Sequence, residues 1–468
     1  MDDKPVVKSF MHRDSFFVYT PYSNHILRIS QGQFRELRNL ENFGFHEYML
    51  QKRKTAESHE LVSLMRSGFI TKPFIDEVKH PATDDYVALI NRSMRSIVLQ
   101  VTQRCNFSCR YCHDMQPGSV SIIDGKSEMS WDVAKRSIDF LMSHSQDSEI
   151  IDIYFYGGEP LLNFDIIKRV VEYTDVQINS KRVIYHITTN GSLIKEDIAK
   201  FFAAYRFKVA ISLDGGKERQ NWTRKFANGD NTFDIVWSNV QMLRSIYGEY
   251  DNDDIVFLPV IFADENRKPV VEFFESNNVE RERITFLDAD TSGIDYSHGV
   301  SRIKDAENGI DNAKWVDYDK LEKETIDGFL EKYNNKHAIG KPWHHAGSCV
   351  PGRYKLFVNT NGFFYPCELA PNYSDLCIGN IDSGINVERA LRLLNIGVLT
   401  KDECMNCWAV RFCRMCVINC VDKEKLCISK ETKRLNCIAH QNRTLKLLKK
   451  HVDESPMFWD TSLKQNID

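Results

Sequence analysis

Apolar and polar residues alternate in a regular way along the middle of the chain. Six apolar stretches have the length and content of strands, at residues 97–101, 150–156, 183–189, 208–213, 255–262 and 284–287. The gaps between them carry helical spacing: after Ser130, the apolar positions Trp131, Ala134, Ile138 and Leu141 recur every three or four residues. Strands that alternate with helices predict parallel βαβ units. We therefore expect an α/β sheet or partial barrel with its site at the C-terminal strand ends.

The pattern changes on both sides of this region. Two predicted strands and two helical stretches occupy the first 90 residues, at 15–21, 25–30, 33–40 and 59–65. They predict a small α+β module. Residues 289–348 form a polar connection that holds one predicted helix, from about residue 315 to residue 333.

Composition restricts the class of protein. The chain has 468 residues, of which 42% are hydrophobic and 27% charged, as in globular proteins with two or three domains. No apolar run approaches the ~18 to 20 residues of a membrane helix, and the first residues are too polar for a signal peptide. We therefore expect a cytoplasmic protein with no membrane partner. With 61 Lys and Arg against 65 Asp and Glu, no basic field indicates a nucleic acid partner.

The thirteen cysteines are unevenly placed. None precedes Cys105, none lies between Cys112 and Cys349, and ten lie between Cys349 and Cys437. In a large chain without an export signal, such groups indicate metal binding rather than a disulfide framework.

The first group, Cys105, Cys109 and Cys112, directly follows the first predicted barrel strand. Three thiolates within eight residues can face one point on a loop, and such soft ligands suit an iron–sulfur cluster or zinc. Three ligands leave one iron of a [4Fe–4S] cluster free for another molecule. A structural zinc loop with a distant fourth ligand is the alternative.

This group resembles the CxxxCxφC signature of the radical S-adenosylmethionine (radical SAM) enzymes, with Tyr111 at the aromatic position. The resemblance implies that the free iron chelates the amino and carboxylate groups of SAM. An electron from the cluster then cleaves SAM to methionine and a 5′-deoxyadenosyl radical. It also implies a reductant such as flavodoxin or ferredoxin.

Further motifs of the family follow at strand ends. Gly157, Gly158 and Glu159 match its GGEP element, in which glycines allow a close backbone approach and the carboxylate contacts the methionine ammonium. A tight turn is the alternative for the glycine pair. Three later polar residues resemble the family's ribose and carboxylate contacts to SAM, although ordinary loop chemistry would also explain them: Asn190, Ser212 and Arg224.

Residues 349–437 resemble the cysteine-rich SPASM extension of many radical SAM enzymes. Cys349, Gly362 and Cys367 fit the first half of its pattern. The resemblance implies that one auxiliary [4Fe–4S] cluster is held by four cysteines: Cys404, Cys407, Cys413 and Cys437. The chain then departs from the pattern. The resemblance assigns the other auxiliary cluster to Cys349 and Cys367, together with one or both of Cys416 and Cys420.

Three clusters are therefore expected in all. One extra cysteine of sulfatase-maturing relatives is missing after Cys349, which leaves room for an open iron in that second auxiliary cluster. Zinc knuckles are the alternative for the closely spaced pairs. Cys377 and Cys427 receive no role beyond small hydrophobic residues.

The N-terminal module resembles the winged-helix-like precursor-recognition element of peptide-modifying enzymes, where a leader peptide adds as a strand to the sheet. A packing or dimerisation domain is the alternative. The full prediction is an α/β protein with a partial (βα)6 radical SAM barrel between this module and the SPASM domain. Its segments are a module, a core, a linker, a SPASM domain and a tail: residues 1–90, 91–300, 301–345, 346–440 and 441–468.

The resemblance implies a maturase of ribosomally made, cysteine-rich precursor peptides. It is most similar to the sactipeptide, ranthipeptide and freyrasin maturases, which form thioethers between a cysteine sulfur and a carbon. Oxidation of a sulfatase residue to formylglycine, with Asp288 as the base, is a second hypothesis, and carbon–carbon crosslinking is a variant. A non-catalytic iron–sulfur protein that binds peptides is a third hypothesis, and it predicts no 5′-deoxyadenosine.

Overall fold

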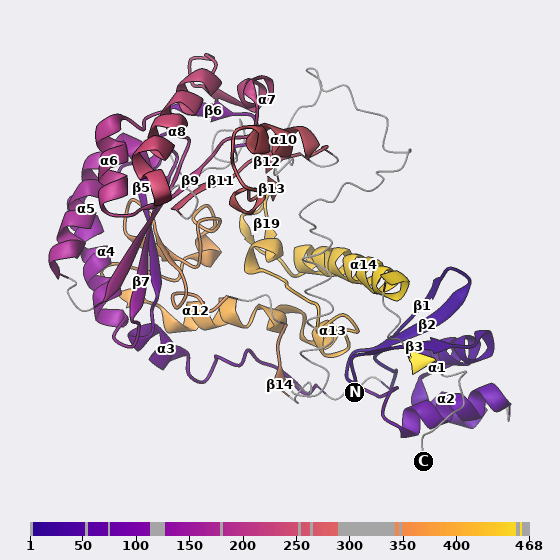
Figure 1. Cartoon of the computed structure of the whole chain (residues 1–468). Coiled ribbons are helices and arrows are strands. Elements are labelled where there is room, and N and C mark those ends of the chain that lie inside the picture. Colours follow the sequence, from indigo (N-terminus) through magenta and orange to yellow (C-terminus); the bar gives the residue numbers. More distant parts are fainter. Residues whose placement is uncertain are drawn as a thin grey trace. The chain divides into compact units, whose positions relative to one another are not determined.

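The structure is a computed structural model of the whole chain (Figure 1). It describes residues 3–51, 55–73, 75–112, 127–177, 181–250, 254–262, 265–288, 342–345, 349–454 and 459–460. Contacts group the chain into two units. Unit 1 comprises Met1–Asp84, Lys314–Cys349 and Leu391–Asp468, and unit 2 comprises Asp85–Ala313 and Val350–Ala390. The segment boundaries expected from the sequence stay predictions.

Unit 2 is built on a parallel sheet in which strands consecutive in the chain are neighbours. The strands are β5 (Ser96–Thr102), β7 (Ile150–Gly157), β8 (Arg182–Thr189), β9 (Lys208–Ile211) and β11 (Ile255–Phe257). Every residue of β5 is buried, as expected for a strand covered on both faces. The first four predicted strands are therefore confirmed.

The fifth predicted strand is divided in two. Pro259 has no N–H to donate to a sheet, and it separates β11 from β12 (Val260–Ile261). β12 pairs with β13 (Leu287–Asp288), which begins at the last residue of the sixth predicted strand. Ile284 forms only an isolated parallel bridge to Phe257.

Helices connect these strands and lie along the outer side of the sheet (Figure 1). The helices are α3 (Tyr86–Arg92), α4 (Trp131–His144), α5 (Phe164–Gln177), α6 (Glu196–Ala204), α7 (Lys217–Thr223), α8 (Phe233–Tyr247) and α10 (Lys268–Ser276). α4 begins where the sequence predicts, because the Ser130 hydroxyl accepts a hydrogen bond from the Val133 N–H. The alternation confirms the predicted partial α/β barrel.

Four short strands extend the sheet beyond β5. They are β15 (Leu356–Val358), β16 (Phe363–Tyr365), β17 (Gly379–Asn380) and β18 (Gly384–Ile385). β15 pairs in parallel with β5, and β16, β17 and β18 follow as an antiparallel series. The first part of the cysteine-rich region therefore belongs to the same sheet as the barrel strands.

Unit 1 contains the N-terminal module. Its antiparallel strands are β1 (Lys8–His12), β2 (Ser15–Thr20) and β3 (His25–Ile29), and its helices are α1 (Gln31–Gln51), interrupted at Gly44, and α2 (Ala56–Arg66). Both predicted strands are confirmed, and β1 adds a third. Val18, Leu27, Leu37 and Leu61 form its buried core.

The other described elements of unit 1 are mostly short. They are β4 (Glu77–Val78), β14 (Pro342–Trp343), α13 (Lys401–Met405), β19 (Val421–Asp422), β20 (Cys427–Ile428), β21 (Trp459–Asp460) and the long helix α14 (Lys430–Glu454). Leu448 of α14 packs with Phe10, Phe17 and Tyr19 of the N-terminal sheet. α12 (Val387–Leu394) spans the division between the units. The helix predicted at 315–333 lies outside the described residues.

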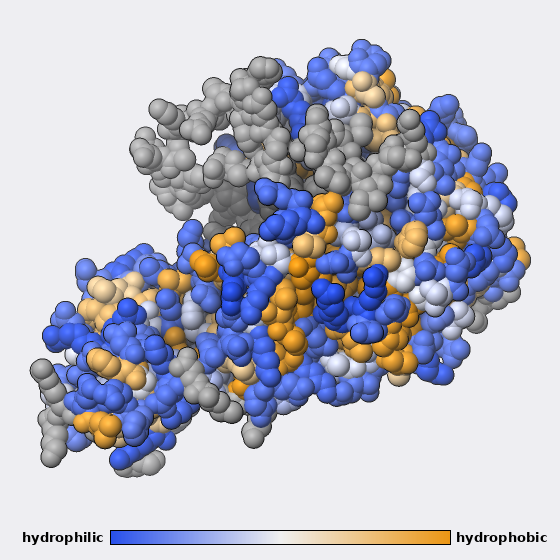
Figure 2. Space-filling model, turned by 180° about the vertical axis from the view of Figure 1, so that it is seen from behind, coloured by the Kyte–Doolittle hydropathy of each residue, from blue (hydrophilic) through white to orange (hydrophobic). Residues whose placement is uncertain are grey.

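The face in Figure 2 is mainly hydrophilic, with apolar residues gathered in patches. Large apolar side chains that are exposed include Leu50, Val176 and Leu369. Within the described part of the chain, no helix combines the length and apolar character needed to cross a membrane.

Candidate active site

The first cysteine group lies directly after β5. Cys109 ends β6 (Phe107–Cys109), and β6 pairs with β10 (Arg224–Phe226) so that Cys109 is opposite Arg224. Burial, with a smaller contribution from the neighbouring thiols of the group, raises the pKa of the Cys105 thiol to about 12 and that of the Cys109 thiol to about 11. Thiolate ligands at this site therefore need a positive partner, which an iron cluster would supply.

Gly157 ends β7 and Gly158 follows it, and both lie against the backbone that leads to Cys105. Gly157 has φ +153°, and a Cβ on it would lie 2.2 Å from the Thr102 carbonyl oxygen. A Cβ on Gly158 would lie 2.5 Å from the Arg104 oxygen. The glycines are thus needed for the contact between two strand ends, whatever they contribute to SAM binding.

Glu159 is fully buried, and its carboxylate joins the ends of β7 and β8. It accepts hydrogen bonds from the Leu161 N–H (3.1 Å), the Thr189 hydroxyl (2.8 Å) and the Asn190 N–H (2.7 Å). Burial outweighs these bonds and raises the pKa of Glu159 to about 7. Its contact with the methionine ammonium stays a prediction, and this bridging role is one that the sequence did not indicate.

Asn190 and Ser212 follow β8 and β9. The Asn190 side chain donates to Asn106, which lies between Cys105 and Cys109, at 2.9 Å. The Ser212 N–H donates to the Thr189 carbonyl at 2.8 Å. Both residues therefore lie at C-terminal strand ends, and Asn190 contacts the cysteine loop directly.

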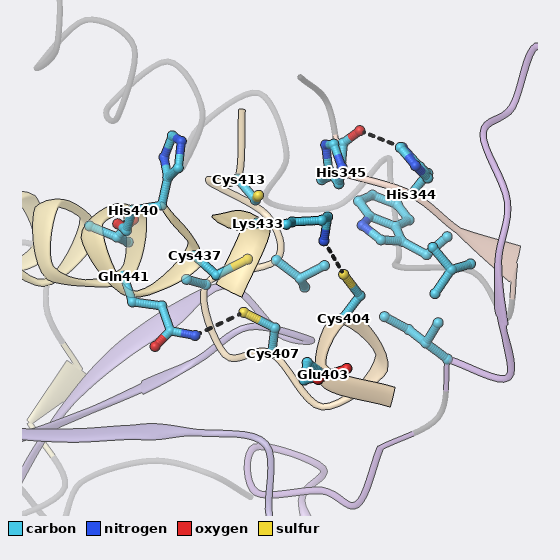
Figure 3. Close-up of a pocket in the computed structure, with 16 residues that line it drawn as sticks. His344, His345, Glu403, Cys404, Cys407, Cys413, Lys433, Cys437, His440 and Gln441 are labelled. Carbon is cyan, nitrogen blue, oxygen red and sulfur yellow. Dashed lines mark hydrogen bonds between the residues drawn. The ribbon is translucent and has the colours of Figure 1, made fainter. Parts of the chain in front are cut away.

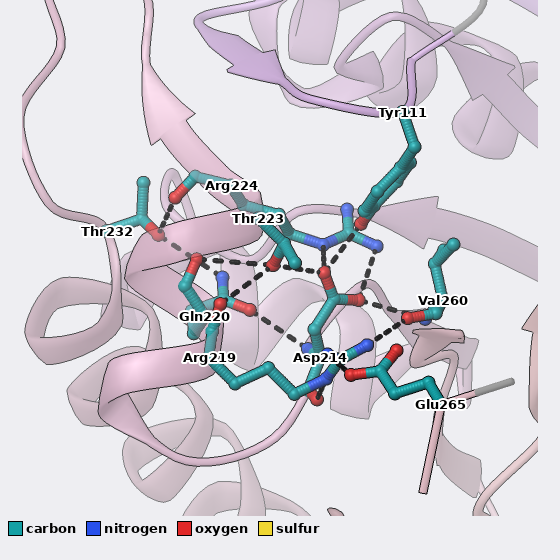
Figure 4. A network of polar contacts seen from close by, with 9 residues as sticks. All are labelled: Tyr111, Asp214, Arg219, Gln220, Thr223, Arg224, Thr232, Val260 and Glu265. Atoms are coloured by element: carbon teal, nitrogen blue, oxygen red, sulfur yellow. Dashed lines mark hydrogen bonds and ion pairs between the residues drawn. The ribbon is translucent and has the colours of Figure 1, made fainter. Parts of the chain in front are cut away.

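Arg224 belongs to a buried network centred on Asp214 (Figure 4). The Asp214 carboxylate accepts from the Tyr111 hydroxyl (2.7 Å), the Thr223 hydroxyl (2.6 Å) and the Val260 N–H (2.9 Å). Arg224 pairs with it at 3.1 Å and lies over the Tyr111 ring, 5.2 Å from the ring centroid.

Charge explains the protonation state of this network. Burial alone would raise the pKa of Asp214, but the charge and hydrogen bonds of Arg224, with the bond from Thr223, lower it overall. Arg224 also opposes the rise in the pKa of Cys109. Sequence reasoning named Arg224 and Tyr111 but missed Asp214 as their common partner. A carboxylate just after a strand, with an arginine ten residues later, was the available signal.

Asp288 ends β13, and its backbone pairs with Ile261. Its side chain lies outside the described part of the structure, so its role as a base stays a prediction.

Four cysteines of the second group line one pocket in unit 1 (Figure 3). They are Cys404, Cys407, Cys413 and Cys437. Burial raises the pKa of Cys407 to about 11 and that of Cys413 to about 12. The structure thus brings together the four residues expected to hold one auxiliary cluster.

The pocket shows no arrangement for a single ion. Among the described residues, no three metal-ligating side chains lie close enough to share one metal ion. Each ligand of a [4Fe–4S] cluster binds a different iron, so cluster ligands lie farther apart than those of one ion.

The remaining cysteines are divided between the units. Cys367 lies in unit 2, whereas the other three lie in unit 1. Of these three, Cys349 is exposed, Cys416 is partly buried and Cys420 is buried. Their assignment to the second auxiliary cluster stays a prediction. Cys377 and Cys427 are only partly buried, and the Cys377 thiol contacts the Gly379 carbonyl at 3.4 Å.

Comparison with known proteins identifies the core. Residues 99–276 match the Radical SAM superfamily. A cysteine-type anaerobic sulfatase-maturating enzyme of Clostridium novyi is 30% identical over 165 residues, which cover 34% of this chain and 43% of that enzyme. The radical SAM cyclopropyl synthase TigE of Paramaledivibacter caminithermalis is 21% identical over 349 residues, which cover 71% of this chain and 69% of that enzyme.

The likeness extends to solved structures. A structure of anSMEcpe with bound AdoMet and the Cp18Cys peptide matches with a TM-score of 0.50 and 19% identity. The match covers 77% of this chain and 99% of that one, and it supports the fold alone. The chain spans less than half of the length of the first curated relatives that it matches. These findings, with the cysteine loop at the strand ends, show that the chain contains a radical SAM domain related to those of sulfatase-maturating enzymes and TigE.

Proposed function

We propose that the protein is a radical SAM maturase that installs thioether crosslinks, from cysteine sulfur to carbon, in a ribosomally made precursor peptide. Cys105, Cys109 and Cys112 would hold the cluster that binds SAM, and Cys404, Cys407, Cys413 and Cys437 would hold one auxiliary cluster. When bound, the first cluster and SAM supply a 5′-deoxyadenosyl radical. For the other auxiliary cluster we propose the ligands expected from the sequence, which are Cys349 and Cys367 with one or both of Cys416 and Cys420.

The chain's own residues would shape the SAM site. Asn190, Ser212 and Arg224 would bind or orient SAM, and Gly157 and Gly158 keep the backbone close to the cysteine loop. The Asp214 carboxylate fixes Arg224 and Tyr111 beside Cys109. A site held in this way needs little rearrangement when SAM binds.

One observation in particular supports the proposal of a peptide substrate. The outer edge of β3 in the N-terminal module already accepts an extended segment, because β21 pairs with it in parallel, Trp459 opposite Leu27 and Asp460 opposite Arg28. Main-chain hydrogen bonds at such an edge bind extended chains with little demand on their sequence. This edge is where a leader peptide would add as a strand.

The proposed reaction balances as the loss of two hydrogens from the precursor. One hydrogen atom moves from carbon to the radical and gives 5′-deoxyadenosine. The cysteine thiol loses its proton, the carbon–sulfur bond forms, and one electron leaves to an acceptor, for which the auxiliary clusters are the candidates. A bound thiolate close to the carbon combines activation with proximity.

The test is anaerobic co-expression with any small cysteine-rich peptide that proves to be encoded beside this chain, followed by mass spectrometry of the peptide. Each turnover should remove two hydrogens and make one cysteine resistant to alkylation, even after reduction. A disulfide gives the same mass loss but regains its thiols on reduction. The proposal is falsified if every cysteine of the modified precursor is alkylated after reduction.

Formylglycine formation is the second candidate, and the likeness to the Clostridium novyi sulfatase-maturating enzyme favours it. It requires a base near the radical, for which Asp288 is proposed. Incubating the enzyme with a sulfatase peptide and, separately, with a leader-bearing peptide distinguishes the two functions. A formylglycine-forming enzyme should convert the sulfatase peptide, and a thioether-forming enzyme should convert the leader-bearing peptide.

A further inference from the structure

The pocket of Cys404, Cys407, Cys413 and Cys437 contains a lysine that is almost completely buried. The Lys433 residue is 1% exposed, and its ammonium contacts the Thr400 hydroxyl and, at 3.6 Å, the Cys404 sulfur (Figure 3). Within the described residues, Lys433 forms no ion pair with a carboxylate. A buried cation is costly without a counter-charge, and the one carboxylate among the residues that line this pocket, Glu403, pairs with Arg434 instead.

Two further donors line the same pocket. The Gln441 amide donates to the Cys407 sulfur at 3.6 Å (Figure 3). His345 is 3% exposed, and neither of its ring nitrogens has a partner among the residues that the structure describes. The neighbouring His344 differs, because its Nδ1 bonds the His345 carbonyl and its Nε2 accepts from the Gly397 N–H.

Helix α14 explains why donors and thiols converge. Lys433, Cys437 and Gln441 are spaced four residues apart, which places them on one face of the helix. One helical face therefore supplies a cysteine together with an ammonium and an amide.

We infer that Lys433, Gln441 and His345 form a donor shell around the cluster held by Cys404, Cys407, Cys413 and Cys437, and that this shell sets its reduction potential. The inference rests on the proposed function for these four ligands. A [4Fe–4S] cluster with four thiolates is negatively charged and gains one more negative charge on reduction. Hydrogen bonds to its sulfurs and a nearby fixed positive charge favour the reduced form, so they raise the potential.

Replacing the donors one at a time should show how much each contributes to the midpoint potential of the cluster. Lys433→Met keeps the side-chain length and removes the charge, so it should lower the midpoint potential. We expect at least a tenfold shift in the reduction equilibrium, or about 59 mV for one electron. Lys433→Arg keeps the charge and should retain most of the potential. Gln441→Leu removes one hydrogen bond and should give a smaller shift in the same direction.

The matched control is Lys446→Met, because Lys446 is an exposed lysine on the same helix. The readouts are iron per chain and an anaerobic redox titration followed by electron paramagnetic resonance. Cys404→Ala with Cys407→Ala identifies the titration step that belongs to this cluster. The expected result is a lowered midpoint in Lys433→Met, full iron content, and no change in Lys446→Met.

A failure of the donor-shell inference can be distinguished from a failure of the proposed cluster assignment. Unchanged midpoints with full iron in Lys433→Met would overturn the donor shell and leave the cluster assignment intact. Unchanged iron in the double cysteine variant would instead overturn the assignment of this cluster, and with it the inference. If Lys433→Met does not load iron, Gln441→Leu decides, because an unchanged midpoint there refutes the shell.

Discussion

Asp214→Ala removes the buried carboxylate that binds Arg224, the Tyr111 hydroxyl and the Val260 N–H. Arg224 is 6% exposed, so its guanidinium cannot turn to water when its partner is lost. Removing one partner of such a buried pair costs about 3–5 kcal/mol of unfolding free energy. The Tyr111 hydroxyl and the Val260 N–H lose their acceptor as well, which places the expected loss at the upper end.

A double variant and a control isolate the cause. Asp214→Ala with Arg224→Met removes the unpaired charge as well, so it should recover at least about half of the loss. Asp254 is also a buried carboxylate, but its partners Arg206 and Lys208 are 52% and 38% exposed. These cations stay solvated without it, so Asp254→Ala should cost only about 1 kcal/mol.

The assay is urea unfolding of the reduced apoprotein, with hydrogen exchange of the barrel strands to separate unit 2 from unit 1. The reasoning is refuted if Asp214→Ala loses no more stability than Asp254→Ala. It is also refuted if the double variant is no more stable than Asp214→Ala, because the stranded charge would then not be the cause.

Two other perturbations probe the same strand ends. Gly157→Ala should force the Thr102 backbone to move, cost about 1–3 kcal/mol and reduce iron loading, whereas Gly216→Ala, whose Cβ would meet nothing closer than 3.5 Å, should do neither. Iron analysis and urea unfolding check this, and equal behaviour of the two variants would contradict it. The raised pKa of Glu159 means that its stabilising effect is complete below about pH 4.5 and is lost as pH rises through about 7. The unfolding free energy of the wild type should therefore fall over this pH range relative to that of Glu159→Gln. Parallel pH profiles of the two unfolding free energies would contradict the raised pKa of Glu159. Ending the chain at Glu454 frees the β3 edge of β21, and affinity for a leader-bearing peptide should rise about tenfold in calorimetry. Unchanged affinity would mean that the leader binds elsewhere.

Local patterns were sufficient where each element depends on its own residues. The barrel strands and α4 follow from apolar runs, helical spacing and the cap at Ser130. Pro259 shows the limit, since the apolar run continues through it although the sheet cannot. β15 to β18 have two or three residues each, too few for any periodic signal, and β15 joins the sheet by pairing with β5, far away in the chain.

Site residues divide in the same way. Cysteine spacing indicated the clusters, because ligands on one loop or helix are close in sequence as well as in space. The position of Asp214 after a strand could be seen in the sequence, but its shared partners could not, and neither could the burial of Lys433, because both depend on residues of other segments. A single lysine in a polar helix carries no sign that folding will bury it among thiols.

The most direct test of the account is 5′-deoxyadenosine formation from SAM by anaerobically reconstituted protein with dithionite. The account predicts that wild type binds about 12 iron atoms per chain and forms 5′-deoxyadenosine. Replacing Cys105, Cys109 and Cys112 by Ala should remove about four iron atoms and abolish the product. A wild-type protein that saturates with zinc, or a triple variant that still cleaves SAM, would contradict it.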